Sequence, residues 1–325
     1  MAEAVGWPFE IRRLAFRPTE LVTNRLLGIT LLGLDRGQSD PLAPPWPELV
    51  LTTGRRNEPV ARWIQREAGG PERCRLVHVG RPWAPVDAFD LIVTSPQYAL
   101  PRHPRILHTE ASLHRVTPAA LGAAADRWRS ELVGLPMPRI AVLLGGHVGP
   151  WTFTAAKGAV LGDQIDAMAR ELGGSLLVST SARTPPSVIE AVSSALMAPH
   201  RLHRWRQGDP DNPYLGFLAL ADRVVVTSDS MSMLTEATAT GRPVFVFDLA
   251  DLRGESPLSG RAVLFHLGRV LGPRQLRRDV TAIHRAHLEA GRAVPLGQPW
   301  PEGPQRGPLA DAETAAERVR ALFAA

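Results

Sequence analysis

Residues 224–247 constrain the fold of this chain more than any other segment. An apolar run rich in β-branched residues stops at the polar residues 228–230, and Gly241 and Pro243 end a short predicted helix before a second apolar strand. In a strand–turn–helix unit of this kind, the first backbone N–H groups of the helix point beyond the strand. Those unpaired donors and the positive end of the helix dipole favour an anion, most often a phosphate.

Glu236 lies about one and a half turns into this predicted helix. Its carboxylate could accept hydrogen bonds from ribose hydroxyls behind a bound phosphate. A buried strand–helix–strand unit, with a polar turn and a Glu that only stabilises the helix, explains the same pattern. Both interpretations stay open at this point.

The segment resembles the nucleotide-binding end of GT-B glycosyltransferases, where a Glu in a Glu-Ala…Gly-x-Pro-Val context holds the nucleotide ribose. It is more closely similar to the elongated-mitochondria (ELM) family, which comprises plant mitochondrial fission factors and bacterial homologues of largely unassigned function. The family pattern continues, in order, at Thr53-Gly-Arg-Arg, Leu113-His-Arg-Val-Thr, Leu144-Gly-Gly, Thr180-Ser-Ala-Arg-Thr and Asn212-Pro-Tyr. The resemblance implies a bacterial ELM homologue with a GT-B-like fold.

Strand and helix patterns alternate along the chain, which predicts α/β architecture with parallel sheets. The predicted elements include a helix at about 118–132 and strands at 139–144 and 202–205. We expect two Rossmann-like domains that face a cleft, residues 1–136 and 137–325, with the link at residues 134–138. The resemblance also implies that a terminal helix, about residues 311–323, crosses back to the first domain. ELM-like proteins open with a further strand, loop and helix, so we expect either an upstream start codon or a lost first βα unit.

The composition is that of a globular protein without the charge pattern of a nucleic-acid-binding protein. The net charge is +5, but 36 of the 37 basic residues are Arg and the charges are interspersed without a long basic tract. Cys74 is the only cysteine, so an intrachain disulfide and a Cys-based metal site are excluded, and a small buried thiol is expected. Because the charges are interspersed, we expect no nucleic-acid partner. We expect a cytoplasmic protein, because no secretory signal opens the chain.

Four loops follow predicted strands of the second domain, where doubly wound sheets bind their ligands. Glycines permit a close approach to the backbone, and hydroxyls with a fixed guanidinium suit a diphosphate. Each loop alone is weak evidence because Ser and Thr are ordinary helix caps. The predicted ligand contacts are Gly145, Gly146, Thr180, Ser181, Arg183, Thr184, Asn212, Tyr214, Ser228, Asp229, Ser230, Ser232, Met233 and Glu236.

Three residues of the first domain complete the predicted site. Arg55 and Arg56 precede a helix, where two cations repel the dipole unless an anion is present, so they are predicted to bind phosphate or carboxylate. The alternative is that both are solvated or pair with a nearby acid. His114 is the candidate general base because imidazole titrates near neutral pH, although a loop His is more often structural.

Several chemistries lack their motifs. There is no HExxH or Cys/His cluster, no Walker A lysine, no GxGxxG fingerprint and no GxSxG elbow. We expect no metal and no required cofactor, with a nucleoside diphosphate or nucleotide sugar as the ligand and a metal-independent glycosyltransferase as the function. The alternative is a non-catalytic scaffold in peripheral contact with the inner membrane, through the apolar residues 26–34 and the flanking Arg12, Arg13, Arg17 and Arg25.

Overall fold

The computed structural model describes residues 1–20, 28–148, 151–250, 267, 279, 282–302 and 309–324. The chain divides into two compact units. The first comprises Met1–Leu113, Pro273–Asp279 and Ala310–Ala325, and the second comprises His114–Gly272 and Val280–Leu309. Each unit contains its own parallel sheet, so the predicted α/β class with two parallel-sheet domains is confirmed.

The sheet of the first unit has the order β3-β4-β5-β6, and all three pairings are parallel. The four strands are Leu49–Thr53, Arg75–Val79, Leu91–Thr94 and Ile106–His108. Helix α3, Glu58–Glu67, connects the first two, with Pro59 in its opening turn where a missing N–H costs nothing. A separate antiparallel pair joins β1, Ala15–Phe16, to β2, Leu34–Asp35.

Successive residues of a strand point to opposite faces, and both faces of this sheet are covered. Leu76 and Ile92 pack with Ala61 of α3 on one face, whereas Val77 and Val93 face the other way. That second face is covered by the short α1, Ala2–Val5, and by the C-terminal α11, Asp311–Arg320. A 3₁₀ turn, Ala321–Phe323, ends the described chain. The terminal helix thus packs within the first unit.

The second unit contains a six-stranded sheet of order β12-β11-β10-β7-β8-β9, parallel throughout. In sheet order the strands are Val294–Pro295, Val244–Phe247, Arg223–Thr227, Arg139–Leu144, Ser175–Thr180 and His200–His203. The apolar character of β7, β8 and β10 agrees with the burial of all their residues except the partly exposed Arg139 and Arg223.

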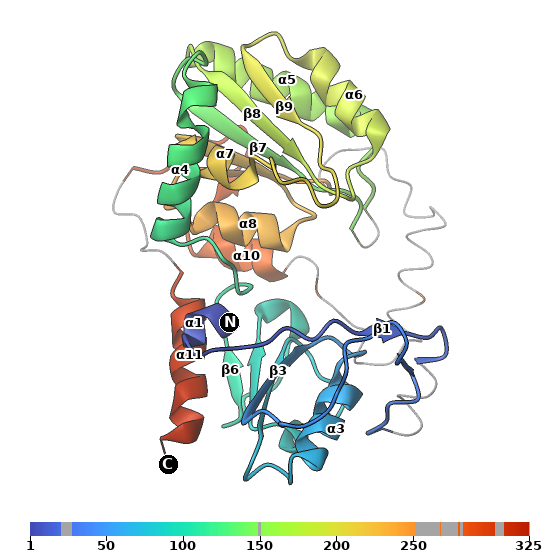
Figure 1. The fold of residues 1–325 in the computed structure, drawn as a ribbon. Helices are drawn as coiled ribbons and strands as arrows, with labels where there is room; N and C mark the ends of the chain where they lie inside the picture. The colour runs from blue at the N-terminus through green and yellow to red at the C-terminus, as the bar shows by residue number, and fades with distance from the viewer. Residues whose placement is uncertain are drawn as a thin grey trace. The chain divides into compact units, whose positions relative to one another are not determined.

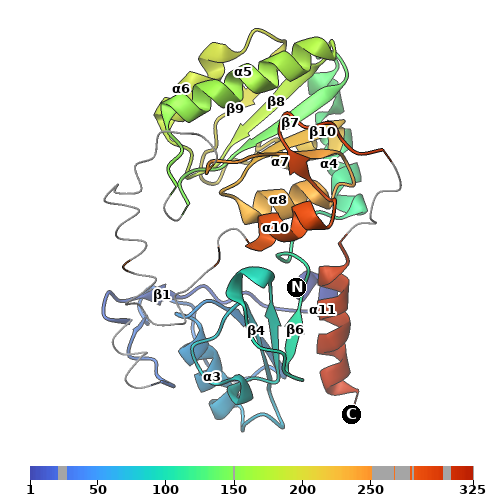
Figure 2. The same ribbon diagram turned by 180° about the vertical axis from the view of Figure 1, so that it is seen from behind.

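Helices cover both faces of this sheet (Figures 1 and 2). On one face α5, Ala155–Glu171, and α6, Pro186–Ala195, pack against Ile140, Val142 and Leu144. On the other, α7, Tyr214–Leu220, and α8, Met231–Thr238, pack against Ala141 and Leu143. Helices α4, Pro118–Leu132, and α10, Ala282–Glu289, contact α7 and α8 respectively.

Some boundaries differ from those predicted. The sequence places the domain boundary at residue 136, but the compact units divide after Leu113, because α4 packs against α7 of the second unit. The strand predicted at 202–205 is observed as β9 at His200–His203. It ends before Trp205, whose backbone N–H bonds the hydroxyl of Thr180. Cys74 is fully buried as expected, and burial raises the pKa of its thiol to about 11.

The described part of the apolar run at residues 26–34 is irregular up to Leu34, which is buried and begins β2. Residues 28–33 form bends and turns that lead into β2, and Leu32 is 60% exposed. Residues 25–27, which include Arg25, lie outside the described chain. Among the helices that the structure describes, none has the length and apolar character required to cross a bilayer.

Candidate functional site

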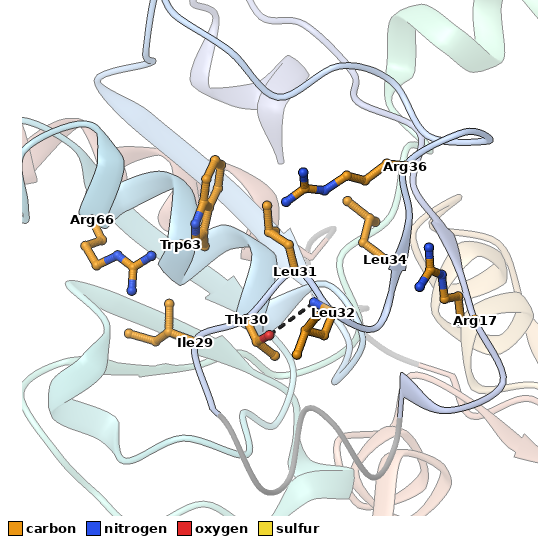
Figure 3. A pocket seen from close by; sticks show the side chains of 9 residues that line it. All are labelled: Arg17, Ile29, Thr30, Leu31, Leu32, Leu34, Arg36, Trp63 and Arg66. Atoms are coloured by element: carbon orange, nitrogen blue, oxygen red, sulfur yellow. Dashed lines mark hydrogen bonds between the residues drawn. The ribbon is translucent and has the colours of Figure 1, made fainter.

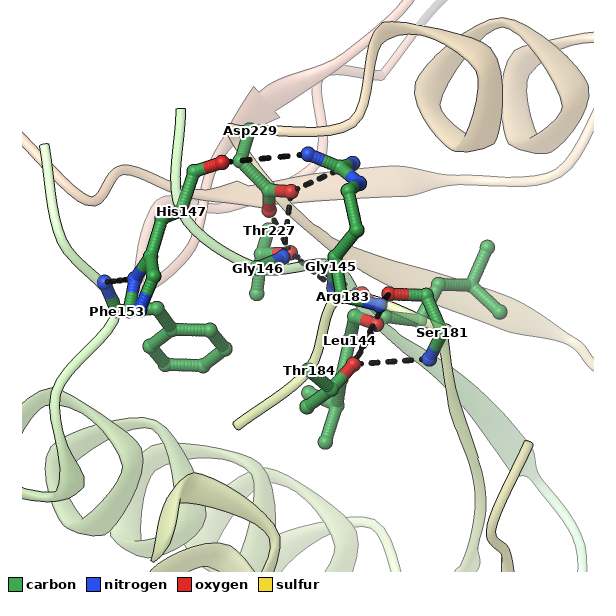
Figure 4. Close-up of polar contacts among 11 residues, drawn as sticks. Leu144, Gly145, Gly146, His147, Phe153, Ser181, Arg183, Thr184, Thr227 and Asp229 are labelled. Atoms are coloured by element: carbon green, nitrogen blue, oxygen red, sulfur yellow. Dashed lines mark hydrogen bonds and ion pairs between the residues drawn. The ribbon is translucent and has the colours of Figure 1, made fainter. Parts of the chain in front are cut away.

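The loops predicted to bind a ligand meet at the point where the strand order of the second unit reverses. Strands β8 and β9 lie on one side of β7, and β10, β11 and β12 lie on the other. Open parallel sheets bind ligands beyond the carboxyl ends of their strands at such a switch point. The loops that carry Gly145, Arg183 and Asp229 follow β7, β8 and β10, and they contact one another (Figure 4).

Asp229 is the central residue of this cluster. Its buried carboxylate accepts hydrogen bonds from the N–H of Gly146 at 2.6 Å and from the hydroxyl of Thr227 at 2.7 Å, and it pairs with Arg183 at 3.0 Å. Burial raises the pKa of the Asp229 carboxyl, while these hydrogen bonds and Arg183 oppose the rise. The carboxylate of Asp229 therefore accepts from the N–H of Gly146, a donor that the sequence predicts to bind a ligand.

The two glycines serve this internal contact. A Cβ atom at Gly145 would lie 2.1 Å from a carboxylate oxygen of Asp229, and one at Gly146 would lie 2.3 Å from the carbonyl oxygen of Arg183. The N–H of Gly145 donates to Thr227 at 2.8 Å. Both glycine N–H groups thus have protein partners, and in this conformation the close approach expected of a ligand is made by Asp229 and Arg183.

The hydroxyls after β8 also have local partners. Thr184 accepts from the N–H of Ser181 and donates to the carbonyl of Leu144, both at 2.8 Å. The hydroxyl of Thr180 accepts from Trp205 at 2.8 Å. Arg183 differs, because its side chain is half exposed while it donates to the His147 carbonyl at 3.3 Å as well as to Asp229. In this loop Arg183 is the group with surface left for an anion.

The N-terminus of α8 retains unpaired donors. Ser230 occupies the N-cap position, but its side chain makes no capping hydrogen bond. Across the described residues, no acceptor bonds the N–H groups of Met231, Ser232 or Met233. Ser232 is exposed. The described residues thus leave three N–H donors at the positive end of the helix dipole, the position where the sequence predicts an anion.

Glu236 lies one and a half turns further along α8 and contacts α7. One of its carboxylate oxygens accepts a hydrogen bond of 2.5 Å from the hydroxyl of Tyr214. Burial raises the pKa of Glu236, and the hydrogen bond from Tyr214 opposes the rise. Asn212 accepts a hydrogen bond from the N–H of Tyr214 at 3.0 Å, so it holds the start of α7 in place.

Ser228 belongs to a separate contact at the end of β10. Its hydroxyl donates to Asp248 and accepts from the N–H of Leu249, both at 3.0 Å. The pair ties the ends of β10 and β11 together. The sequence did not single out Asp248 or Thr227, although each lies directly at a strand end, where a polar residue is the available signal.

The two arginines of the first unit have an internal acidic partner. Arg56 pairs with the buried Glu20 at 2.8 Å and Arg55 pairs with it at 3.4 Å. Arg55 also lies over the ring of Trp83, 5.7 Å from its centre. Both arginines therefore pair with a nearby acid, which is the alternative that the sequence leaves open. Their role as phosphate ligands stays a prediction.

His114 lies at the start of the second unit, not in the first as the sequence predicts. Both of its ring nitrogens are shielded from solvent. An acceptor hydroxyl does not reach either nitrogen in this conformation, so the general-base role stays a prediction. Within the described ranges, no group of three or more His, Cys, Asp or Glu side chains is arranged to hold a metal ion.

Comparison with known proteins identifies the family. A family model described as mitochondrial fission ELM1 matches residues 1–323, and the chain belongs to this family. It is 30% identical over 226 residues to the mitochondrial fission protein ELM1 of Arabidopsis thaliana, which covers 62% of this chain and 51% of that protein. It is 22% identical over 233 residues to the uncharacterized protein RP120 of Rickettsia prowazekii, covering 62% and 64%. The chain thus spans about half to two thirds of these relatives' lengths.

Solved structures show more distant similarity. The UDP-GlcNAc 2-epimerase of Methanocaldococcus jannaschii is 11% identical with a TM-score of 0.45, covering 86% of this chain and 77% of that one. A glycosyltransferase of Rickettsia africae is 9% identical with a TM-score of 0.38, covering 85% and 76%.

Proposed function

We propose that this member of the mitochondrial fission ELM1 family binds a nucleoside diphosphate or its sugar conjugate at the α8 end of the second unit. The proposal depends on one arrangement above all. The N-terminus of α8 offers three unpaired N–H groups, and the same helix presents a carboxylate one and a half turns later at Glu236. This spacing suits an anionic group followed by a polyol, which is the order of groups in a nucleotide.

Each group would have a distinct task. The N–H groups of Met231, Ser232 and Met233 and the helix dipole would bind phosphate oxygens. Arg183 would add charge-assisted hydrogen bonds, since half of its side chain is exposed although Asp229 holds one of its nitrogens. The oxygen of Glu236 that does not bond Tyr214 would accept from a ribose hydroxyl.

The reaction we propose is glycosyl transfer without a required metal or cofactor. In such a transfer the bond between sugar and diphosphate breaks, and the leaving diphosphate gains negative charge. Arg183 and the α8 N–H groups would stabilise that charge as it develops, which is the usual source of rate enhancement for an anionic leaving group. His114 is kept as the candidate base for the acceptor hydroxyl, provided that its ring becomes accessible when substrate binds.

The test is calorimetric titration of the full chain with UDP, GDP, ADP and their sugar conjugates, followed by the 2′,3′-dideoxy form of the nucleotide that binds. Glu236→Gln should weaken binding of the ribonucleotide about tenfold, the effect of one hydrogen bond to a charged group. The same variant should leave the dideoxy form unchanged. Glu190→Gln on α6 is the matched control, because that exposed carboxylate pairs with Arg204 at the surface.

If Glu236→Gln weakens binding of the ribo and dideoxy forms equally, the ribose does not contact Glu236. Absence of binding by every nucleotide would reject the proposal. Transfer itself is tested by release of free nucleoside diphosphate from the bound sugar conjugate in the presence of candidate acceptors.

A non-catalytic interaction role is the second candidate, and two observations favour it. The carboxylate of Asp229 already accepts the hydrogen bond that Gly146, in the loop after β7, would otherwise donate to a ligand anion. In the first unit, Phe9 and Ile11 are 50% and 74% exposed beside Arg12 and Arg13. Exposed apolar and cationic side chains together suit the surface of an anionic membrane. Sedimentation with anionic and neutral vesicles separates the two candidates, because this role requires binding that depends on lipid charge.

A further inference from the structure

A cavity lies in the first unit, apart from the residues proposed to bind the nucleotide, and its lining includes part of the apolar run at residues 26–34. It has a volume of about 310 Å³ and is lined by Ile29, Leu31, Leu32, Leu34, Trp63, Thr30, Arg17, Arg36 and Arg66. Its walls come from the segment before β2, from the residues flanking β1 and β2, and from α3 (Figure 3). This volume is at the lower end of the range found for sites that bind small molecules.

The lining combines two chemistries. Four aliphatic side chains and the Trp63 ring form an apolar surface, and three guanidinium groups stand around it. In Figure 3, Arg66 and Arg17 lie on opposite sides of the leucines, and the guanidinium group of Arg36 lies beside Leu31 and Leu34. Among the described residues that line the cavity, none is acidic. An apolar surface next to cationic side chains is complementary to a molecule with an alkyl chain and an anionic head.

Two of the three arginines lack an internal counterion. Within the described residues, neither Arg17 nor Arg36 pairs with a carboxylate, whereas Arg66 bonds Glu67 at 3.1 Å. Arg55 and Arg56 of the same unit, by contrast, both pair with Glu20. Two unpaired guanidinium groups beside apolar surface leave a site of net positive charge, which an anion neutralises.

We propose that this cavity binds one molecule of a single-chain anionic amphiphile, with its alkyl chain against Leu31, Leu34 and Trp63 and its head between Arg17 and Arg36. The head is a carboxylate or a phosphate, since a guanidinium donates two parallel hydrogen bonds to either. The inference is independent of the nucleotide site, because every lining residue belongs to the first unit.

The test is isothermal titration of the full chain with dodecyl phosphate and with dodecanoate, each below its micelle concentration. One molecule should bind per chain. Dodecyl maltoside shares the chain but has a neutral head, and inorganic phosphate has the head without the chain, so both should bind at least tenfold more weakly. Comparing the phosphate with the carboxylate identifies the preferred head.

The variant Arg17→Gln/Arg36→Gln should weaken binding of the anionic amphiphile at least about tenfold, as two partly exposed ion pairs would. It should leave maltoside binding unchanged. Arg102→Gln is the matched control, because Arg102 is an exposed arginine of the same unit outside the cavity. Far-ultraviolet circular dichroism of each variant verifies folding.

A 12-bromododecyl phosphate probe locates the chain, because bromine quenches a tryptophan that it contacts. Quenching should decrease in Trp63→Phe. Equal affinity for the phosphate and the maltoside would overturn the proposal. So would an unaltered affinity in the double arginine variant, or binding to anionic vesicles without binding of the monomeric amphiphile.

Discussion

The hydroxyl of Tyr214 on α7 donates a hydrogen bond of 2.5 Å to the carboxylate of Glu236 on α8. Burial is the main reason why the pKa of Glu236 is raised and the pKa of Tyr214 lies well above 10. The tyrosine therefore keeps its proton at neutral pH and fixes one oxygen of Glu236. The contact between the two helices therefore also fixes the orientation of the other oxygen, which we propose accepts from a ligand hydroxyl.

Tyr214→Phe should separate this positioning role from simple packing. The ring remains, but Glu236 loses its donor, so stability should fall by about 1–2 kcal/mol, as for a hydrogen bond to a charged group. Binding of the nucleotide should weaken severalfold, and the loss should disappear for the dideoxy nucleotide. Urea denaturation and calorimetry measure the two effects. Tyr98→Phe removes the hydroxyl of the only other tyrosine and should leave nucleotide affinity unchanged.

The parts of this fold that local patterns determine are predicted well. Helix α4 occupies Pro118–Leu132 as predicted, because Pro118 suits a first turn and the hydroxyl of Thr117 caps the N–H of Ala120 at 3.1 Å. Strand β7 occupies Arg139–Leu144 as predicted, since a continuous apolar run is typical of a parallel strand buried on both faces.

The site is less predictable because its contacts join distant residues. Asp229 reads locally as a polar turn residue, and nothing near it indicates that its carboxylate turns inward to Gly146, 83 positions away. Glu20 similarly neutralises Arg56 across 36 positions. The sequence predicts which loops meet, because the ends of parallel strands lie at one edge of the sheet. It does not predict which side chains of these loops bond one another.

The C-terminal helix is attached to the first unit by Asp311. Its carboxylate accepts from the N–H groups of Glu110 and Ala111, each at 2.9 Å. Asp311→Ala would leave both donors without this acceptor and should cost about 2–3 kcal/mol. Amide hydrogen exchange should show faster opening of α11. Glu313→Ala, an exposed acid in the same first turn, should produce less than about 0.5 kcal/mol, and an equal cost in both variants would assign the effect to the helix dipole instead.

Two buried histidines should make the protein sensitive to acid. The pKa of His78 falls from 6.5 to about 4 because of burial, opposed by a backbone hydrogen bond at Arg81. The pKa of His287 falls to about 4 because of burial, followed by Arg292 and His284. Between pH 6.5 and 4 the unfolded chain binds more protons than the folded one, so stability is lost as pH falls through this window.

Each histidine should contribute roughly 3 kcal/mol to this loss. Urea denaturation at intervals from pH 7 to 4 measures it, and His287→Gln should flatten the pH dependence by the share of one residue. His103→Gln, at an exposed position, should retain the full slope. A slope that His287→Gln leaves unchanged would show that His287 remains neutral in both states or is charged in both.

The contact between Gly145 and Asp229 makes a quantitative prediction about the switch-point loop. An alanine Cβ at position 145 would lie 2.1 Å from the carboxylate, and neither group has a flexible stem that could yield. Gly145→Ala should therefore destabilise the protein by more than about 2 kcal/mol. Asp229→Ala should cost a similar amount, because the N–H of Gly146 loses its acceptor and Arg183 its partner.

The double variant Gly145→Ala/Asp229→Ala should cost less than the sum of the two, by at least about 1 kcal/mol, because the new methyl occupies space that the carboxylate has left. Gly122→Ala is the matched control: it lies within α4 with no atom within 4 Å of the new Cβ, so it should stabilise the protein by up to about 1 kcal/mol. Urea denaturation of the four variants completes the cycle. Strict additivity would mean that the methyl at position 145 and the carboxylate of Asp229 do not interact, and the contact between Gly145 and Asp229 would then not determine the conformation of this loop.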